Sequence, residues 1–382
     1  MSIPLALYVH LPWCVRKCPY CDFNSHVHRG TLPEAGYVAA LLQDLAADAP
    51  AARARPVASV FFGGGTPSLF APEAIAAFLA GARAQVALAP DAEVTLEANP
   101  GTIEHGRFAG YRDAGVNRVS LGAQSFSPAQ LKRLGRIHEA ADTAGAVGEL
   151  AAAGLANFNL DLMWALPGQR PDEALADVAA ALGFAPPHLS HYQLTLEPGT
   201  VFYAAPPALP DDETAEAIQQ LTHARLAAGG YRQYEVSAWA QPGAECRHNL
   251  NYWRYGDYLG VGAGAHGKLT DASGAIVRTE KAKQPREYLE RAAANATLGT
   301  TISVAPDERP FEFMLNALRL TEGFTVEAFE ERTGLAVAAI AEPLDRALGR
   351  GLLEVSGRGF RATALGRRFL NDLTAFFLPK AR

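Results

Sequence analysis

Residues 5–21, LALYVHLPWCVRKCPYC, combine a short apolar run with three cysteines packed into eight residues. The apolar run over residues 5–9 predicts a buried strand, so the cysteines fall in the loop at its carboxyl end, where α/β proteins bind ligands. Three thiolates from one short loop can hold three irons of a [4Fe-4S] cluster and leave the fourth iron open to a small molecule, whereas a structural zinc site takes four protein ligands. The loop with Cys14, Cys18 and Cys21 therefore favours such a cluster, with a zinc knuckle and three unrelated core thiols as the alternatives.

Short apolar runs alternate with longer alanine-rich stretches over residues 5–196. This alternation is typical of repeated βα units that build a parallel sheet. Six such units are fewer than the eight that close a barrel, so we expect an α/β fold with an open, partial (β/α)6 barrel. The predicted strands cover residues 5–9, 57–62, 93–97, 118–121, 157–162 and 189–196, and the predicted helices cover residues 34–49, 72–86, 103–114, 140–153 and 172–182.

Polar residues and glycines follow several of the predicted strands. They are the Gly-Gly-Gly-Thr-Pro run at 63–67, the segments at 97–100 and 122–125, and Asp161. Because the carboxyl ends of parallel strands meet at one edge of a sheet, we expect these residues at one barrel mouth. Glycines let the backbone approach a ligand, and Thr66, Glu97, Gln124 and Asp161 bring hydrogen-bonding groups to the same rim. The alternative is that glycine and proline merely form the turns between strands and helices.

The composition predicts a globular protein of the cytoplasm. The 382 residues are 49% hydrophobic and 19% charged, and no apolar run is long enough to cross a bilayer. A net charge of -6 gives no general attraction to nucleic acid or to an anionic membrane surface. Four cysteines, three of them in one loop, fit a reducing compartment, and the first residues lack the features of an export signal. We therefore expect no membrane insertion and no nucleic-acid partner.

The pattern changes near Ala305. Helices are expected at about 307–320, 325–333 and 338–350, followed by a strand at 352–355, a turn at 357–359 and a last helix from Ala364, an order that suggests a small winged-helix domain. Residues 307–382 carry eleven Lys or Arg against eleven Asp or Glu, which argues against DNA binding. We expect three parts, namely the partial barrel over 1–235, a connecting region over 236–304 and a winged-helix-like α+β domain over 305–382.

The spacing Cys14-x3-Cys18-x2-Cys21, with an aromatic residue at Tyr20 and the glycine run one strand later, resembles the radical S-adenosylmethionine enzymes. The similarity is greatest to the branch that contains oxygen-independent coproporphyrinogen III oxidase and its haem-chaperone relatives, and it covers nearly the whole chain. The other positions that carry it are residues 8–13, Glu97, Gln124, Arg136, Asp161 and the C-terminal small domain.

The resemblance implies that Cys14, Cys18 and Cys21 ligate a [4Fe-4S] cluster whose open iron binds S-adenosylmethionine. A zwitterionic ligand with a sulfonium needs carboxylates, amides and a guanidinium around it. Taken alone, Arg136 is better interpreted as a surface cation than as a ligand contact. The contacts to S-adenosylmethionine that the resemblance implies come from Tyr8, Tyr20, Gly64, Gly65, Thr66, Glu97, Gln124, Arg136 and Asp161.

Two departures distinguish this chain from the oxidase. The oxidase has a further cysteine two positions after the third ligand, where this chain has Phe23, and it has an N-terminal arm before the first strand, where this chain has a few residues. Both departures favour the haem-chaperone relatives over the decarboxylating enzyme.

The sequence His248-Asn249-Leu250-Asn251-Tyr252-Trp253 is similar to the His-Asn-x-x-Tyr-Trp signature of those relatives. Imidazole is a natural axial ligand of haem iron, and Tyr252 and Trp253 can pack on a porphyrin face. Without the resemblance, a lone histidine beside aromatic residues is more often a hydrogen-bonded core residue. Cys246, two residues earlier, is interpreted as a buried and unreactive thiol.

The resemblance therefore implies a haem chaperone that binds haem through His248 and delivers it to apo-haemoproteins, respiratory enzymes above all. The cluster and S-adenosylmethionine would control assembly or transfer. A homodimer and a transient, membrane-associated acceptor are left open as partners. The alternative is radical oxidative decarboxylation of coproporphyrinogen III to protoporphyrinogen IX, and a third class is a zinc-stabilised scaffold.

Overall fold

A computed structural model describes residues 3–52, 55–101 and 106–379 of the chain. In this described part, twelve strands form one sheet, in the order β14-β13-β12-β11-β1-β4-β5-β6-β7-β8-β10-β9. The six predicted strands lie next to one another in the middle of the sheet and are all parallel, so the predicted (β/α)6 arrangement is confirmed. These strands are β1 (Leu5–Leu11), β4 (Val57–Gly64), β5 (Leu88–Ala98), β6 (Arg118–Gln124), β7 (Phe158–Trp164) and β8 (His188–Gln193).

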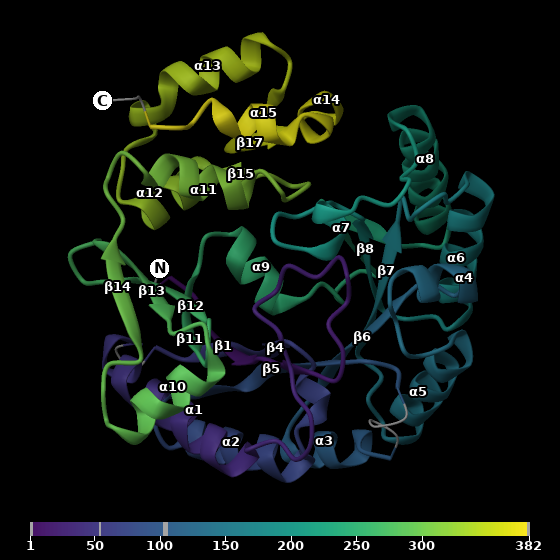
Figure 1. The fold of residues 1–382 in the computed structure, drawn as a ribbon. Helices are drawn as coiled ribbons and strands as arrows, with labels where there is room; N and C mark the ends of the chain where they lie inside the picture. Colours follow the sequence, from purple (N-terminus) through teal and green to yellow (C-terminus); the bar gives the residue numbers. More distant parts are fainter. Residues whose placement is uncertain (1–2, 53–54, 102–105, 380–382) are drawn as a thin grey trace.

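Helices surround the outer side of these parallel strands (Figure 1). They are α1 (Glu34–Asp48), α2 (Pro72–Arg83), α3 (Phe108–Ala114), α4 (Pro128–Arg133), α5 (Ala140–Ala152), α6 (Pro171–Gly183) and α8 (Asp212–Ala228), whereas α7 (Val201–Ala204) packs against the cysteine loop. Of the helix predicted at 103–114, residues 103–105 lie outside the described residues, and the described part corresponds to α3. Among the described helices, none has the length and hydropathy that crossing a membrane requires.

The region over 236–304 extends the sheet at both edges, although the sequence pattern predicts a connecting region there. β11 pairs with β1 in parallel, and three further strands follow in antiparallel order. The sequence pattern does not reveal β13 and β14, because much of these two strands is exposed or half-buried and they lack a clear apolar run. The elements of this region are β10 (Ala238–Ala240), α9 (Arg247–Trp253), β11 (Asp257–Val261), β12 (His266–Thr270), β13 (Ile276–Lys281), α10 (Pro285–Ala293) and β14 (Gly299–Ser303), and β10 pairs with β9 (Arg232–Glu235), which precedes the region.

The C-terminal segment forms a separate small core around Phe313, Phe324 and Phe329. Its helices and its three-stranded sheet follow the order expected for a winged-helix-like domain, except that the helix predicted from residue 338 begins at Ala341 after a 3-10 turn. The domain lies beside α9 and the last strands of the large sheet (Figure 1). Its elements are α11 (Arg309–Ala317), β15 (Phe324–Thr325), α12 (Val326–Thr333), α13 (Ala341–Gly349), β16 (Leu353–Ser356), β17 (Gly359–Ala362), α14 (Ala364–Arg368) and α15 (Leu370–Ala375).

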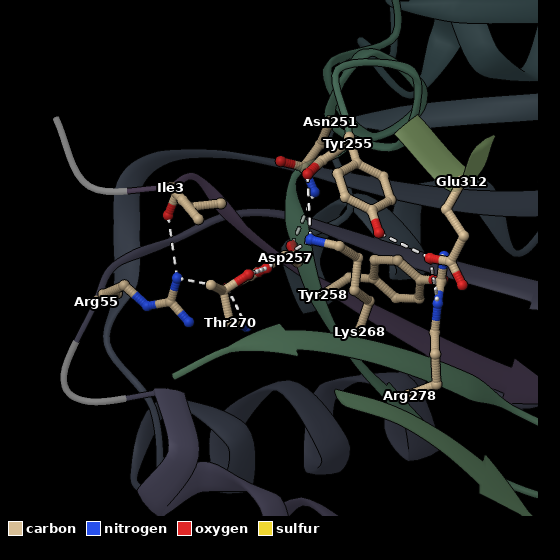
Figure 2. Close-up of polar contacts among 10 residues, drawn as sticks. All are labelled: Ile3, Arg55, Asn251, Tyr255, Asp257, Tyr258, Lys268, Thr270, Arg278 and Glu312. Carbon is tan, nitrogen blue, oxygen red and sulfur yellow. Dashed lines mark hydrogen bonds and ion pairs between the residues drawn. The ribbon is translucent and has the colours of Figure 1, made fainter. Parts of the chain in front are cut away.

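A buried ion-pair network joins β11 to β12 and to the segment before β4 (Figure 2). The Asp257 carboxylate lies 3.0 Å from Lys268 Nζ and 2.8 Å from Arg55 Nη1. The backbone N–H and the hydroxyl of Thr270 also donate to it, each at 2.9 Å. Burial alone would raise the pKa of Asp257, but these partners hold it below its ordinary value. Because the Lys268 side chain is 1% exposed, each charge of the pair depends on the other.

The same network reaches the C-terminal domain through the turn before β11 (Figure 2). The carbonyl oxygen of Tyr255 accepts a hydrogen bond from Lys268 Nζ at 3.2 Å. The Tyr255 hydroxyl donates to Glu312 on α11 at 2.7 Å. Arg278 on β13 lies 2.6 Å from the same Glu312 and donates to the Tyr258 hydroxyl at 2.7 Å. The sheet and the C-terminal domain are therefore connected by polar contacts as well as by apolar packing.

Replacing Asp257 by Asn is expected to lower the free energy of unfolding by about 3 kcal/mol, because the buried Lys268 ammonium loses its counter-charge. Urea denaturation at neutral pH measures this loss. The control is Glu322→Gln, which removes an exposed ion pair to Arg254 and is expected to cost less than about 1 kcal/mol. Equal small losses in both variants would contradict the structural role of the buried pair.

Candidate functional site

The cysteine loop is fixed at both ends by a small parallel sheet. β2 (Trp13–Cys14) and β3 (His26–Val27) pair with each other on either side of the loop. The backbone N–H of His26 donates to the Pro12 carbonyl at 2.7 Å, and that of His28 donates to the Cys14 carbonyl at 3.0 Å. Since β2 follows β1 directly, this pairing holds the loop at the carboxyl end of the parallel sheet.

The glycine run after β4 packs against the base of the cysteine loop. The backbone N–H groups of Gly65 and Thr66 donate to the carbonyls of Leu11 and Trp13, each at 2.8 Å. A Cβ on Gly65 would lie 2.5 Å from the Trp13 carbonyl oxygen, closer than atoms approach without a shift of the backbone. Gly64 has a φ of 115°, and its Cβ would lie 2.6 Å from the imidazole ring of His10. These two glycines are therefore required for packing, whether or not a ligand is bound.

A cavity of about 540 Å³ opens at this end of the sheet. The described residues that line it include every predicted site residue except Gly64, whose Cβ position faces His10 instead. Residues that lie far apart in the sequence thus share one cavity wall. The predicted residues that line it are Tyr8, Cys14, Cys18, Tyr20, Cys21, Gly65, Thr66, Glu97, Gln124, Arg136, Asp161 and His248.

Each of the three loop thiols has a hydrogen-bonding neighbour. Thr66 Oγ1 lies 3.5 Å from Cys14 Sγ, Arg136 Nη1 lies 3.8 Å from Cys18 Sγ, and Ser25 Oγ lies 3.6 Å from Cys21 Sγ. Burial raises the pKa of the Cys14 thiol, and the Thr66 hydrogen bond opposes that shift.

The three loop thiols are not engaged in disulfides, and each has a hydrogen-bonding neighbour. All four cysteines of the chain are described, and none of them forms a disulfide. Among the described residues, no three His, Cys, Asp or Glu side chains are placed to hold a single metal ion. Donors beside thiolate sulfurs are the contacts that stabilise an iron–sulfur cluster and adjust its potential, so the loop fits a three-thiolate cluster.

Two half-buried carboxylates line the cavity, Glu97 on β5 and Asp161 on β7. Burial, together with the charge of Asp161, raises the pKa of Glu97 to about 8. Burial also raises the pKa of Asp161, although Asn159 Nδ2 donates to it at 2.8 Å and Ser120 Oγ at 3.3 Å. A cationic group that enters the cavity would stabilise the ionised form of both carboxylates, so these side chains favour a cationic ligand.

Arg136 is one of the cationic residues that line the cavity. Its Nη2 donates to the Gly122 carbonyl at 2.8 Å and to the Asn99 side-chain oxygen, while Nη1 points toward Cys18. Gln124, at the end of β6, adopts a φ of 65°, which is uncommon outside glycine and directs its amide into the cavity wall. Carboxylates, an amide and a guanidinium thus surround one space, a donor set that suits a zwitterionic sulfonium ligand.

His248 lies at the inner end of the cavity on α9. It is 2% exposed, and its ring stacks on Phe61 with 5.0 Å between ring centroids. Ser59 Oγ lies 3.0 Å from Nδ1, whereas Nε2 is buried and has no hydrogen-bond partner among the described residues. Burial lowers the pKa of His248 to about 3, so the imidazole is neutral at physiological pH. His248 lines the cavity, and a neutral histidine with one nitrogen hydrogen-bonded and the other unpartnered is arranged as metal-ligating histidines are.

The other side of α9 faces the C-terminal domain. Trp253 does not line the cavity, and its ring packs under the guanidinium of Arg319 at 4.3 Å. Of the two aromatic residues expected to pack on a porphyrin face, Tyr252 lines the cavity and Trp253 does not. Cys246 is buried beside Glu93 at 3.5 Å, and burial raises the pKa of its thiol to about 12.

Several cavity residues were not predicted from the sequence. They lie inside strands rather than after them, at alternate positions whose side chains point into the barrel. The signal that would identify them is a polar residue at every second position of β6, β7 and β8. These residues are Arg118, Ser120, Asn159, Ser190 and Tyr192.

Comparisons with known proteins agree with this site. Residues 8–180 match the model of the radical SAM superfamily, and residues 304–369 match that of the HemN C-terminal domain. In structure, the chain resembles coproporphyrinogen III oxidase (HemN) from Escherichia coli, with a TM-score of 0.83 and 24% identity over 98% of this chain and 90% of the oxidase. The fold and the cysteine loop thus define a radical S-adenosylmethionine protein, and this class implies a [4Fe-4S] cluster and S-adenosylmethionine.

More specific relatives are found by sequence. The chain is 49% identical to the heme chaperone HemW of Escherichia coli (strain K12) over 99% of both chains. It is 47% identical to HemW of Haemophilus influenzae over 99% of this chain and 98% of that one. It is 36% identical to the mitochondrial radical S-adenosyl methionine domain-containing protein 1 of Mus musculus, over 99% of this chain and 88% of that one. The chain belongs to the HemW family.

Glu97 makes the stability of the protein depend on pH. Its pKa is raised from 4.5 to about 8, so between these values the folded protein holds a proton that the unfolded chain has lost. Stability therefore falls as the pH rises through this window, by at most ~1.4 kcal/mol per pH unit. Glu97→Gln is expected to remove this part of the slope in urea denaturation between about pH 5 and pH 8. Glu287→Gln, at an exposed carboxylate on α10, is the control, and a Glu97→Gln slope equal to that of the unsubstituted protein would contradict the prediction.

Proposed function

We propose that this protein is a cytoplasmic haem chaperone, which binds haem through His248 and delivers it to apo-haemoproteins, respiratory enzymes above all. The observation that carries the proposal is the environment of His248, which lines the cavity and whose Nε2 is buried and unpartnered among the described residues. The relatives named heme chaperone HemW, at 49% and 47% identity, support the same function.

The cluster and S-adenosylmethionine belong at the mouth of the same cavity. In this proposal Cys14, Cys18 and Cys21 hold the cluster, which together with S-adenosylmethionine supplies one-electron chemistry when bound. The carboxylates of Glu97 and Asp161 attract the cationic part of the nucleoside ligand. The remaining contacts to that ligand come from Tyr8, Tyr20, Gly65, Thr66, Gln124 and Arg136, which line the cavity, and from Gly64.

Haem ligation by His248 is supported by its neighbours. Ser59 orients the ring through Nδ1, which leaves Nε2 as the nitrogen available to iron. Phe61 and Tyr252 supply aromatic surface beside the imidazole, with ring centroids 5.0 Å from it in both cases. Apolar and aromatic walls of this kind favour a porphyrin.

Transfer to an acceptor requires an exposed edge near the cavity. Phe23 lines the cavity and is 60% exposed. It stands at the position where the oxidase that this chain resembles has a further cysteine. An exposed aromatic side chain at the rim is a contact that an acceptor protein can use.

His248→Ala is expected to weaken haem binding roughly tenfold or more, because the iron loses its axial ligand. The measurement is titration of the anaerobically prepared full-length protein with haem, followed by the Soret band. Arg254→Gln is the matched control, since Arg254 directly follows α9 and pairs with Glu322 at the surface. Added imidazole is expected to restore the Soret band of His248→Ala, which distinguishes the loss of a ligand from misfolding.

Unchanged haem affinity in His248→Ala would remove the proposed ligand. The alternative function, oxidation of coproporphyrinogen III, is tested on the same preparation after reconstitution of the cluster under anaerobic conditions. Formation of protoporphyrinogen IX would overturn the chaperone proposal, whereas haem binding without this turnover supports it.

A further inference from the structure

The residues proposed for haem and those proposed for S-adenosylmethionine line a single cavity. Tyr8 connects the two groups. Its ring centroid lies 6.4 Å from that of His248 and 6.4 Å from that of Phe61, while the charge of Glu97 acts on its hydroxyl. A side chain assigned to the nucleoside ligand therefore lies directly beside the proposed haem ligand.

His248 lines this cavity, and neighbouring side chains cover its unpartnered Nε2, so an iron that binds this nitrogen from the cavity must displace them. Ser59 covers Nδ1, Phe61 covers one ring face, and the Tyr252 ring meets the imidazole edge-on. The whole residue is 2% exposed. The iron lies at the centre of the porphyrin. A porphyrin bound through Nε2 therefore surrounds that nitrogen on all sides and reaches into the space in front of Glu97.

α9 is held from both sides by contacts to the sheet and to the C-terminal domain. The Glu93 carboxylate accepts hydrogen bonds from the backbone N–H groups of Arg247 and His248, at 3.2 and 3.1 Å. On the other side, Trp253 lies under Arg319 of the C-terminal domain. A ligand on His248 must therefore use the existing cavity.

The size of the cavity limits its occupancy. Its volume of about 540 Å³ falls within the range of ~300–1,000 Å³ that is typical for one drug-sized ligand. Haem and S-adenosylmethionine are each at least of that size. Both groups of contacts cannot be satisfied at once.

We infer that haem and S-adenosylmethionine exclude each other from this cavity, so that nucleoside binding displaces haem. This inference rests on the proposed function and adds a means of release to it. A protein that carries haem on His248 gives it up when the nucleoside occupies the space between Tyr8 and Glu97. The cellular supply of S-adenosylmethionine thereby sets how much of the protein is loaded with haem.

The test is a haem titration of the full-length, cluster-containing protein with increasing S-adenosylhomocysteine, which lacks the sulfonium charge and is not cleaved by reduction. The apparent dissociation constant of haem is expected to rise about tenfold when the nucleoside is present at ten times its own dissociation constant. By reciprocity, saturating haem is expected to weaken nucleoside binding, measured by calorimetry, by the corresponding factor.

Glu97→Gln provides the matched variant. It is expected to weaken the binding of S-adenosylmethionine, which is added here without a reductant so that it is not cleaved, and the S-adenosylmethionine concentration that displaces haem should rise by the same factor as its dissociation constant. If the displacing concentration does not change, the effect arises from association of haem with the nucleoside in solution, and the inference is overturned.

The outcomes distinguish the inference from the proposed function. A ternary complex, in which haem affinity is unchanged although calorimetry shows bound nucleoside, overturns the inference and leaves the haem-chaperone proposal intact. Absence of haem binding in the nucleoside-free sample overturns both.

Discussion

The close approach of two backbones, at the base of the cysteine loop and in the glycine run after β4, is the contact on which the site depends. Gly65 and Thr66 donate to the carbonyls of Leu11 and Trp13, and a side chain on Gly65 would collide with the Trp13 carbonyl oxygen. This contact places three thiols over the carboxyl ends of the parallel strands, where Glu97, Asp161 and the other inward-facing polar side chains are found. The glycine run therefore determines the position of the cysteine loop before any ligand is bound.

The inner end of the cavity is formed by a different part of the chain. α9 carries His248 and Tyr252 into the barrel, while Trp253 and Arg254 contact the C-terminal domain. The network around Asp257 and Glu312 connects that domain to the strands beside β1. Because both faces of α9 are held, the C-terminal domain contributes to the position of the proposed haem ligand without lining the cavity.

The sequence identifies the central strands and most of the site because their signals are local. Apolar runs identify β1 and β4 to β8, and residues placed directly after strands, such as Thr66 and Glu97, lie in the cavity as expected. Arg118 and Asn159 were missed because they lie within buried strands, where only alternation shows that a polar side chain points inward. The role of β11 to β14 and the direction of Trp253 depend on tertiary contacts that spacing does not encode. Gly64 packs closely against His10, a contact between two strands that local sequence does not show, and its contact with the ligand stays a prediction.

The central claim is that Cys14, Cys18 and Cys21 hold a [4Fe-4S] cluster with one open iron. Electron paramagnetic resonance of the anaerobically reconstituted, reduced protein, with iron, sulfide and zinc analysed in the same sample, tests it most directly. The account predicts a [4Fe-4S] signal that changes when S-adenosylmethionine is added, is lost in Cys18→Ala and is retained in Cys246→Ala, since Cys246 is buried against Glu93. A dominant zinc content without iron or sulfide, or a cluster signal that S-adenosylmethionine leaves unchanged, would contradict it.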